Sequence, residues 1–417
     1  MNIFFKFLRV SLLSCFALAY TLNAYGSDND RNTSRQYLYA ISNSPSGNSV
    51  VGYQFGTNGS LIPLAGSPFS THGLGQGVSL LVSSDNGLVV SDDNRFLFVP
   101  NRGSNDISVF RIRPNGSLVS VPGSPFRTGG ITPTSLALHG NTLFVTHTGL
   151  DLFNSCRDCD YRGFRVSKSG RLTPIEGATI QLSETPASEP FAIRFSPDGR
   201  YLIGTETGTN KINVYKVTQN ARPGQATLEP VPGSPFDSIG LLPLGFNFNP
   251  LNPTQMFVSN VGLAPGSGSV SSFLMASSGQ IALIDQPVSS GQLATCWINV
   301  TEDGKWLFAS NTDSDTISSY SVSRDGRLSL IRTTPLPRNG VPSGSLIAPV
   351  DMVIMNDEYL YTLTRDVPAI TSFKIAAEGK LTPIAETKFN IPNAVPFGLI
   401  SVNLRKTSKS TVNYEDD

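Results

Sequence analysis

His147 and Glu206 are the two residues of this chain whose types and positions best suit general acid–base chemistry. Each is the last residue of an apolar phrase, typical of a β-strand, that recurs seven times. The final residues of these phrases, which we call the strand-end residues, are Ser42, Asn101, His147, Glu206, Asn260, Asn311 and Thr364. Among them, only the imidazole and the carboxylate can serve as acid and base near neutral pH. We therefore predict His147 and Glu206 as catalytic residues.

Two other interpretations of His147 and Glu206 stay open. The pair can be a solvated feature of a loop mouth, or it can bind a ligand without turnover. Ligand binding is also predicted for Arg102 and Arg365, because each follows a strand-end residue and a guanidinium holds a carboxylate or phosphate with two hydrogen bonds. The other members of this predicted ligand-binding set are Asn101, Asn260 and Asn311. A role in capping a turn would also explain an asparagine at these positions.

Neither a metal nor a cofactor is predicted. The chain has three histidines, at positions 72, 139 and 147, which are too few and too dispersed for a histidine-rich metal centre. A cation bound by oxygen ligands near Asp313 and Asp315 stays open.

Cys156 and Cys159 are predicted to form a disulfide, because two cysteines close in sequence become oxidised in the compartments that exported proteins reach. The chain has no second cysteine pair that would complete a metal site with them. A redox-active pair and two free thiols are the alternatives. Cys296 is flanked by apolar residues and is predicted to be a buried thiol.

The positioning elements follow from the repeat. Its copies recur at a spacing of about 50 residues, each with several β-rich runs and a Gly-containing turn, which is typical of propeller blades. They begin at Tyr37, Phe96, Thr142, Tyr201, Gln255, Trp306 and Tyr359. We predict an all-β, seven-bladed β-propeller of four-stranded antiparallel blades. An unmatched strand at 396–402 is expected to complete the first blade and close the ring.

The phrase Gly-Ser-Pro-Phe occurs three times, at 66–69, 123–126 and 233–236. Gly and Pro favour tight turns, so we predict that each copy connects one blade to the next and that its Phe fills the gap between them.

The chain divides into a signal peptide (1–25), a polar linker (26–35), the propeller (36–404) and a flexible polar tail (405–417). Lys6 and Arg9 precede an apolar run at 10–19 that is too short for a membrane span, which is typical of an export signal. An uncleaved anchor is the alternative. We expect a monomer that is periplasmic or secreted, with no membrane span once the signal is removed.

The charge balance excludes some partners. There are 31 basic and 31 acidic residues, so no broad positive field attracts nucleic acid, and no nucleic-acid partner is predicted.

Three phrases resemble a known family: FLFVPNRGSNDISVFRI (96–112), FSPDGRYLIGTETGTNKINVYKV (195–217) and ATCWINVTEDGKWLFASNTDSDTISSYSV (294–322). They are similar to the seven-bladed lactonase-like propellers, which include bacterial 6-phosphogluconolactonases and fungal carboxymuconate-lactonizing enzymes. Propellers with tyrosine-valine-threonine-asparagine repeats share the phrases. The resemblance covers residues 36–404. It implies a lactone or sugar-acid ligand over the central channel, held by His, Arg and Glu side chains.

The chain departs from the family pattern where those side chains are expected. The residues at these positions are Phe191, Leu244 with Gly245, Val261 and Thr312. Whether the chain is an enzyme is therefore left open. The first hypothesis is an exported lactonase-like propeller that binds or hydrolyses a small lactone or sugar acid. The alternative is a catalytically silent propeller that binds a protein or glycan.

Overall fold

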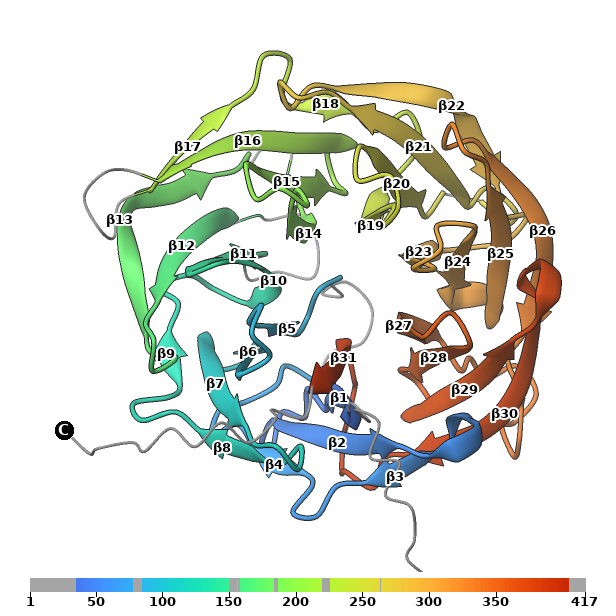
Figure 1. The fold of residues 1–417 in the computed structure, drawn as a ribbon, viewed down its shortest axis with the longest axis horizontal. Helices are drawn as coiled ribbons and strands as arrows, with labels where there is room; N and C mark the ends of the chain where they lie inside the picture. Colours follow the sequence, from blue (N-terminus) through green and yellow to red (C-terminus); the bar gives the residue numbers. More distant parts are fainter. Residues whose placement is uncertain are drawn as a thin grey trace, which may run out of the picture. The chain divides into compact units, whose positions relative to one another are not determined.

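Seven antiparallel β-sheets stand side by side around a central axis in the computed structural model (Figure 1). The structure describes residues 35–77, 85–149, 156, 158–183, 187–219, 226–262 and 264–404. The predicted signal peptide and polar tail lie outside the described residues, as does the linker except for its last residue. No helix in the described ranges has the length and apolar character needed to cross a lipid bilayer.

Each sheet is one blade with four main strands, which follow one another from the centre outward. Blade 1 contains β31 (Leu399–Leu404), β1 (Arg35–Ile41), β2 (Ser49–Phe55) and β3 (Leu61–Pro63). Blade 2 contains β5 (Val89–Val90), β6 (Phe96–Asn101), β7 (Asp106–Ile112) and β8 (Leu118–Ser120). Blades 3 and 4 contain β10 (Pro133–His139), β11 (Thr142–His147), β12 (Asp160–Val166), β13 (Leu172–Gln181), and β14 (Pro190–Phe195), β15 (Tyr201–Glu206), β16 (Lys211–Gln219), β17 (Ala226–Pro230).

The remaining blades have the same order. Blades 5 and 6 contain β19 (Pro243–Phe248), β20 (Gln255–Asn260), β21 (Ser269–Met275), β22 (Ile281–Ser289), and β23 (Thr295–Val300), β24 (Trp306–Asn311), β25 (Thr316–Val322), β26 (Leu328–Pro335). Blade 7 contains β27 (Pro349–Met355), β28 (Tyr359–Thr364), β29 (Ala369–Ile375) and β30 (Leu381–Lys388). Three short 3-10 turns are η1 (Thr57–Gly59), η2 (Thr312–Ser314) and η3 (Ala377–Gly379).

The second strand of each blade explains the recurring apolar phrase. Every residue of β6, β11, β15 and β20 is buried. A strand covered on both faces buries successive side chains, so its sequence is continuously apolar rather than alternating. The predicted seven-bladed, all-β architecture is confirmed.

The ring closes in the first blade, as predicted. β31 pairs antiparallel with β1, with Tyr37 opposite Val402 and Leu38 opposite Ser401. Strands from the two ends of the described chain therefore share one sheet (Figure 1).

The prediction that Gly-Ser-Pro-Phe connects two blades is wrong, although Phe126 packs against side chains of blades 2 and 3, as expected of a residue that fills the gap between them. The Phe of each copy begins a two-residue strand that returns to the third strand of the same blade: β4 (Phe69–Ser70) to β2, β9 (Phe126–Arg127) to β7, and β18 (Phe236–Asp237) to β16. The Ser hydroxyl of the motif accepts a hydrogen bond from a backbone amide of the third strand, where a backbone carbonyl of the neighbouring strand would normally accept it. In blade 2, Val109 N donates to Ser124 Oγ over 2.9 Å. The motif thus interrupts an outer strand instead of connecting two blades.

Bulges in the innermost strands tie neighbouring blades together. The pairing of β19 shifts register between Pro243 and Phe246, which takes backbone carbonyls out of the ladder. Thr205 Oγ1, from blade 4, donates to the freed carbonyl of Leu244 over 2.6 Å. Ser259 Oγ, from blade 5, donates in the same way to the Cys296 carbonyl of blade 6. A hydroxyl just before the strand-end residue therefore has a structural role.

Candidate functional site

The strand-end asparagines are buried, and their amide nitrogens donate hydrogen bonds within their own blades. Asn101 Nδ2 donates to Asp106 Oδ1 over 2.7 Å and to Ser108 Oγ over 2.8 Å. Asn260 and Asn311 make equivalent bonds to hydroxyls of β21 and β25. Each side chain thus joins the end of the second strand to the start of the third.

His147 and Glu206 belong to separate buried networks. His147 Nδ1 lies 2.6 Å from Asp160 Oδ1, and burial lowers the pKa of His147 despite this partner. Glu206 accepts hydrogen bonds of 2.5 Å from Asn213 Nδ2 and Thr209 Oγ1. Both side chains are buried, so the alternative of a solvated pair is wrong. No hydrogen bond or ion pair joins the two among the residues that the structure describes.

The two predicted ligand-binding arginines also lie in different surroundings. The Arg102 guanidinium lies 5.0 Å from the centre of the Phe397 ring, and burial lowers the pKa of Arg102 to about 9. Arg365 makes a two-bonded ion pair with Asp366, with distances of 2.6 and 3.1 Å. Both side chains are buried.

An aromatic side chain, that of Phe191, occupies one of the positions where the family resemblance would place a polar one. The Phe191 ring packs edge-on against Trp297, with centres 5.6 Å apart, and Trp297 lies 6.2 Å from Phe397. These rings come from blades 4, 6 and 1 and are buried together with Leu244. The contacts among these three rings are therefore apolar, and the Arg102 guanidinium lies over the Phe397 ring.

The structure shows the surroundings of the cysteines and of Asp315. Cys156 and Cys159 are joined in a disulfide. Cys296 is a free, buried thiol, and burial raises its pKa to about 12. Asp315 accepts hydrogen bonds from the Ile347 and Ala348 amides. No group of three or more metal-ligating side chains occurs in the described ranges.

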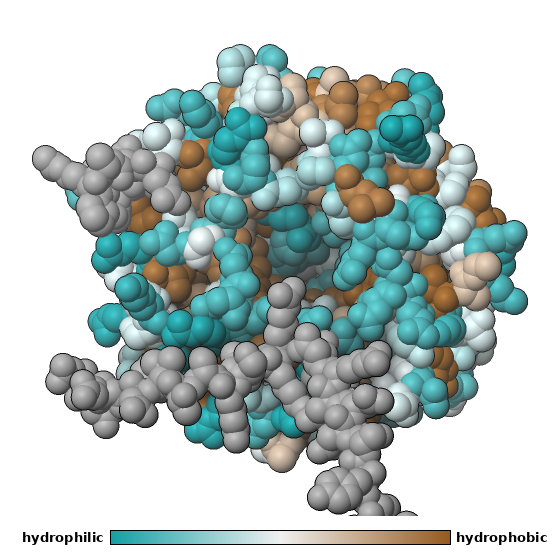
Figure 2. All heavy atoms as spheres, viewed as in Figure 1, coloured by the Kyte–Doolittle hydropathy of each residue, from teal (hydrophilic) through white to brown (hydrophobic). Residues whose placement is uncertain are grey.

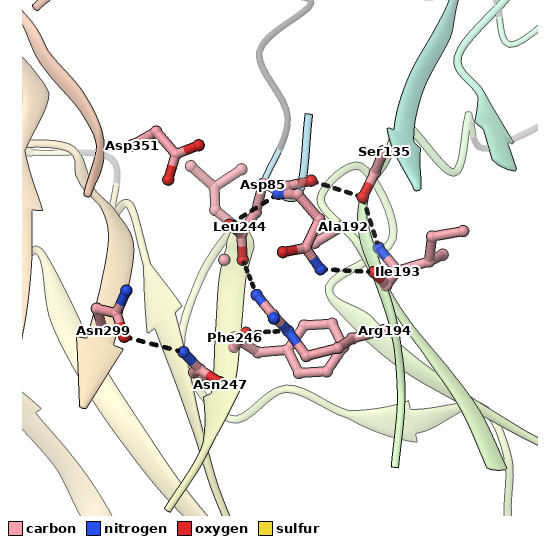
Figure 3. Close-up of polar contacts among 12 residues, drawn as sticks. Asp85, Ser135, Ala192, Ile193, Arg194, Leu244, Phe246, Asn247, Asn299 and Asp351 are labelled. Carbon is pink, nitrogen blue, oxygen red and sulfur yellow. Dashed lines mark hydrogen bonds and ion pairs between the residues drawn. The ribbon is translucent and has the colours of Figure 1, made fainter. Parts of the chain in front are cut away.

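A polar cluster that the sequence reasoning missed lies in the central channel (Figure 3). Asp85 precedes β5, and its backbone carbonyl accepts a 2.5 Å hydrogen bond from Ser135 Oγ of blade 3. Its carboxylate faces Arg194 of blade 4, with Nη2 and Oδ2 3.3 Å apart (Figure 3). A Cβ on Gly245 of blade 5 would lie 3.3 Å from the same oxygen. The Asp85 side chain therefore lies against blades 4 and 5, and the Asp85 backbone is hydrogen-bonded to blade 3.

Asp351 of β27 is the second carboxyl of the cluster and lies across the channel from Arg194 (Figure 3). Its oxygens accept hydrogen bonds from the Met352 and Leu399 amides, at 2.8 and 2.7 Å. Burial and then the charge of Asp85 raise the pKa of Asp351 to about 8. Burial also raises the pKa of Asp85, but the Arg194 guanidinium partly offsets this effect. The two carboxyl groups therefore differ in the cation beside them.

A hollow of about 300 Å³ opens where β10 and β14 end, and its lining includes Asn86, His139 and Arg194. Arg194 is 28% exposed and connects this hollow to the buried carboxylate of Asp85. On the face seen in Figure 2, the centre of the ring is hollowed and hydrophilic atoms lie within it. The guanidinium is one of the few polar groups that this hollow offers a ligand, since most of its lining residues are apolar.

A sequence model of the family described as "Lactonase, 7-bladed beta-propeller" matches residues 166–397, more than half of the chain. This chain belongs to that family.

Solved structures share the fold of this lactonase-family propeller. A candidate 6-phosphogluconolactonase from Bacteroides fragilis aligns with a TM-score of 0.69 and 22% identity, over 88% of this chain and 98% of its own. The periplasmic gluconolactonase of Pseudomonas aeruginosa aligns with a TM-score of 0.67 and 20% identity, over 89% and 100%. Identities this low establish the fold alone. A comparison with curated protein sequences found no match.

The channel cluster of this lactonase-family propeller had a sequence signal. Arg194 and Asp351 stand inside the apolar phrases PFAIRF and PVDMVIM, where a charge is costly unless it is paired. Asp85 has no comparable signal, because it lies before a two-residue strand. Chemically, the cluster offers two carboxyl groups and a guanidinium around one channel.

Proposed function

We propose that this lactonase-family propeller binds a small lactone or its open acid in the central channel and hydrolyses the lactone with Asp85, Arg194 and Asp351. The observation that carries the proposal is the placement of two buried carboxyl groups around one arginine, with only Asp85 paired to it. Only one of the two acids has a guanidinium within ion-pair distance, and such a difference in environment assigns two acids different catalytic roles.

The three side chains divide the reaction among them. Asp85, whose carboxylate form the neighbouring Arg194 guanidinium favours, takes a proton from the attacking water. Arg194 donates a hydrogen bond to the carbonyl oxygen as negative charge develops there. Asp351, protonated up to a pH of about 8, gives its proton to the ring oxygen as the carbon–oxygen bond breaks. The products are the open hydroxy acid and a carboxyl pair that exchanges one proton to return to its starting state.

Export belongs to the same proposal. A disulfide persists in an oxidising compartment, and Cys156 and Cys159 form one. The Pseudomonas aeruginosa neighbour is described as periplasmic. Family membership favours a lactone as the ligand.

The test is a pH-stat assay of lactone opening with five- and six-membered lactones, with and without sugar hydroxyl groups. Asp85→Asn and Arg194→Gln are expected to lower kcat/KM at least 100-fold, as for loss of a general base or an oxyanion donor. Glu206→Gln is the matched variant at the other predicted site and is expected to retain activity within threefold. A loss confined to Glu206→Gln or His147→Gln would instead assign catalysis to the strand-end residues. If the wild type opens none of these lactones, the proposal that the protein is a lactone hydrolase is refuted.

A silent, partner-binding propeller is the second candidate function. It is favoured by the hydrogen bonds that commit the strand-end asparagines, His147 and Glu206 to their own blades. In that case, calorimetry with the lactones and their open acids detects no binding, whereas a protein or glycan partner binds the intact ring.

A further inference from the structure

Two hollows open side by side at the same end of the ring. The first is the one that contains Asn86, His139 and Arg194. The second has a volume of about 330 Å³, and its lining includes Pro197, Tyr201, Pro253, Met275, Ala276 and Ser277. Ser196 and Pro197, in the turn between β14 and β15, line both hollows. A ligand that leaves the first hollow over this turn therefore enters the second.

The second hollow offers mainly apolar contact, because its polar side chains are bonded to the protein. The Tyr201 hydroxyl donates to the Ser277 carbonyl over 2.8 Å. Arg200 Nε donates to Asp198 Oδ2 over 2.6 Å, and the guanidinium lies over the Tyr201 ring. Besides this exposed ion pair, the lining offers a ligand the carbon atoms of proline, alanine, methionine and tyrosine.

The first hollow differs in its chemistry. It contains the exposed part of Arg194, which suits a carbonyl or carboxylate oxygen, and the Asn86 side chain, which already donates to the Ile193 carbonyl. A molecule with a polar head and an apolar substituent would place the head in the first hollow and the substituent in the second.

We infer that the ligand is a lactone with an aliphatic substituent, with its ring beside Arg194 and its substituent crossing Ser196 and Pro197 into the second hollow. This inference rests on the proposed function and specifies its substrate class. Burial of each added methylene group is expected to strengthen binding about fourfold until the hollow is filled.

The experiment is calorimetry and pH-stat kinetics with one lactone ring that bears hydrogen, butyl, hexyl or octyl. Ala276→Glu places a charge in the second hollow, on an exposed position that leaves the core intact. Ser278→Glu adds the same charge to the same turn, at a residue outside that lining, and is the matched control.

Affinity should rise about fourfold per methylene in the wild type and in Ser278→Glu, and remain flat in Ala276→Glu. The unsubstituted lactone should bind all three proteins equally. If the three proteins show the same chain-length dependence, or if the wild type binds and opens only the unsubstituted lactone, the inference is overturned while the proposed function stands. If no lactone of any length is bound or opened, the proposed function fails as well.

Discussion

Replacing Asp351 with asparagine should remove a strong pH dependence of stability. Burial raises the folded-state pKa of Asp351 to about 8, whereas an unfolded chain has the usual value of about 4. Between these values the folded protein holds a proton that the unfolded chain has lost. The protonated carboxyl therefore stabilises the fold fully below pH 4, and this stability is lost as the pH rises to 8.

The size of the effect follows from the width of that interval. A single proton changes the free energy of unfolding by about 1.4 kcal/mol for each pH unit, which gives up to about 4 kcal/mol between pH 5 and pH 8. Asp351→Asn also loses one hydrogen bond from a backbone amide, which adds a roughly constant cost of about 1–3 kcal/mol.

Urea unfolding at pH 5, 6, 7 and 8, followed by the fluorescence of Trp297 and Trp306, measures the difference between the wild type and Asp351→Asn. The free energy of unfolding of the wild type minus that of Asp351→Asn should fall by up to about 4 kcal/mol from pH 5 to pH 8 and change sign, so that the variant becomes the more stable protein at pH 8. Asp303→Asn is the control. Burial acts to raise the pKa of Asp303, but hydrogen bonds from Lys305 and Thr301 hold it below its usual value. The stability that ionised Asp303 contributes is lost only as the pH falls below about 4. The difference in free energy of unfolding between the wild type and Asp303→Asn should therefore stay constant from pH 5 to pH 8.

A constant difference for Asp351→Asn would refute the reasoning. It would mean that Asp351 is already ionised at pH 5, and that it cannot donate a proton to a leaving oxygen at neutral pH. The proposed division of roles between Asp85 and Asp351 would then fail, even if Arg194 still binds the ligand.

Three further outcomes are expected. Thr205→Val should lower the free energy of unfolding by about 1–3 kcal/mol in urea titrations, because the Leu244 carbonyl loses its 2.6 Å donor; an unchanged value would exclude the tie between blades. Removal of the chain from Pro396 onward should abolish the cooperative thermal transition, since β1 loses its partner β31; a truncated protein with the same Tm would contradict ring closure. Cys296 should react with iodoacetamide only after unfolding, because burial raises its pKa to about 12, and labelling of the folded protein within minutes would argue against this burial.

The fold could be predicted because its signals repeat. Seven copies of one apolar phrase fix the number of blades, and each copy is apolar throughout because both faces of the second strand are covered. Gly-Ser-Pro-Phe misled for a local reason. Its residues predict a turn correctly, but a turn within an outer strand and a turn between blades need the same residue types.

Six of the seven strand-end residues end their strands as predicted, and Ser42 follows the last residue of β1, but the sequence did not predict the surroundings of these side chains. The segment that leads in from the preceding blade covers His147 and Asn260: Gly130 packs against His147 so closely that a Cβ would lie 2.4 Å from its ring. Gly240 packs in the same way against Asn260. The sequence shows these glycines but does not show what they cover. Asp85, Arg194 and Asp351 meet only because three distant segments converge on one axis, and no local pattern encodes that convergence.

The pairing of β1 with β31 also has a kinetic consequence. Six blades are built from nearby segments, whereas the first blade must wait for the last described strand. Until then the chain is an open ring whose terminal sheets expose unpaired edges, which readily pair with other chains. Refolding yield should therefore fall as the protein concentration rises, and the rate of closure, more than the stability of any blade, should set how much protein reaches the native state.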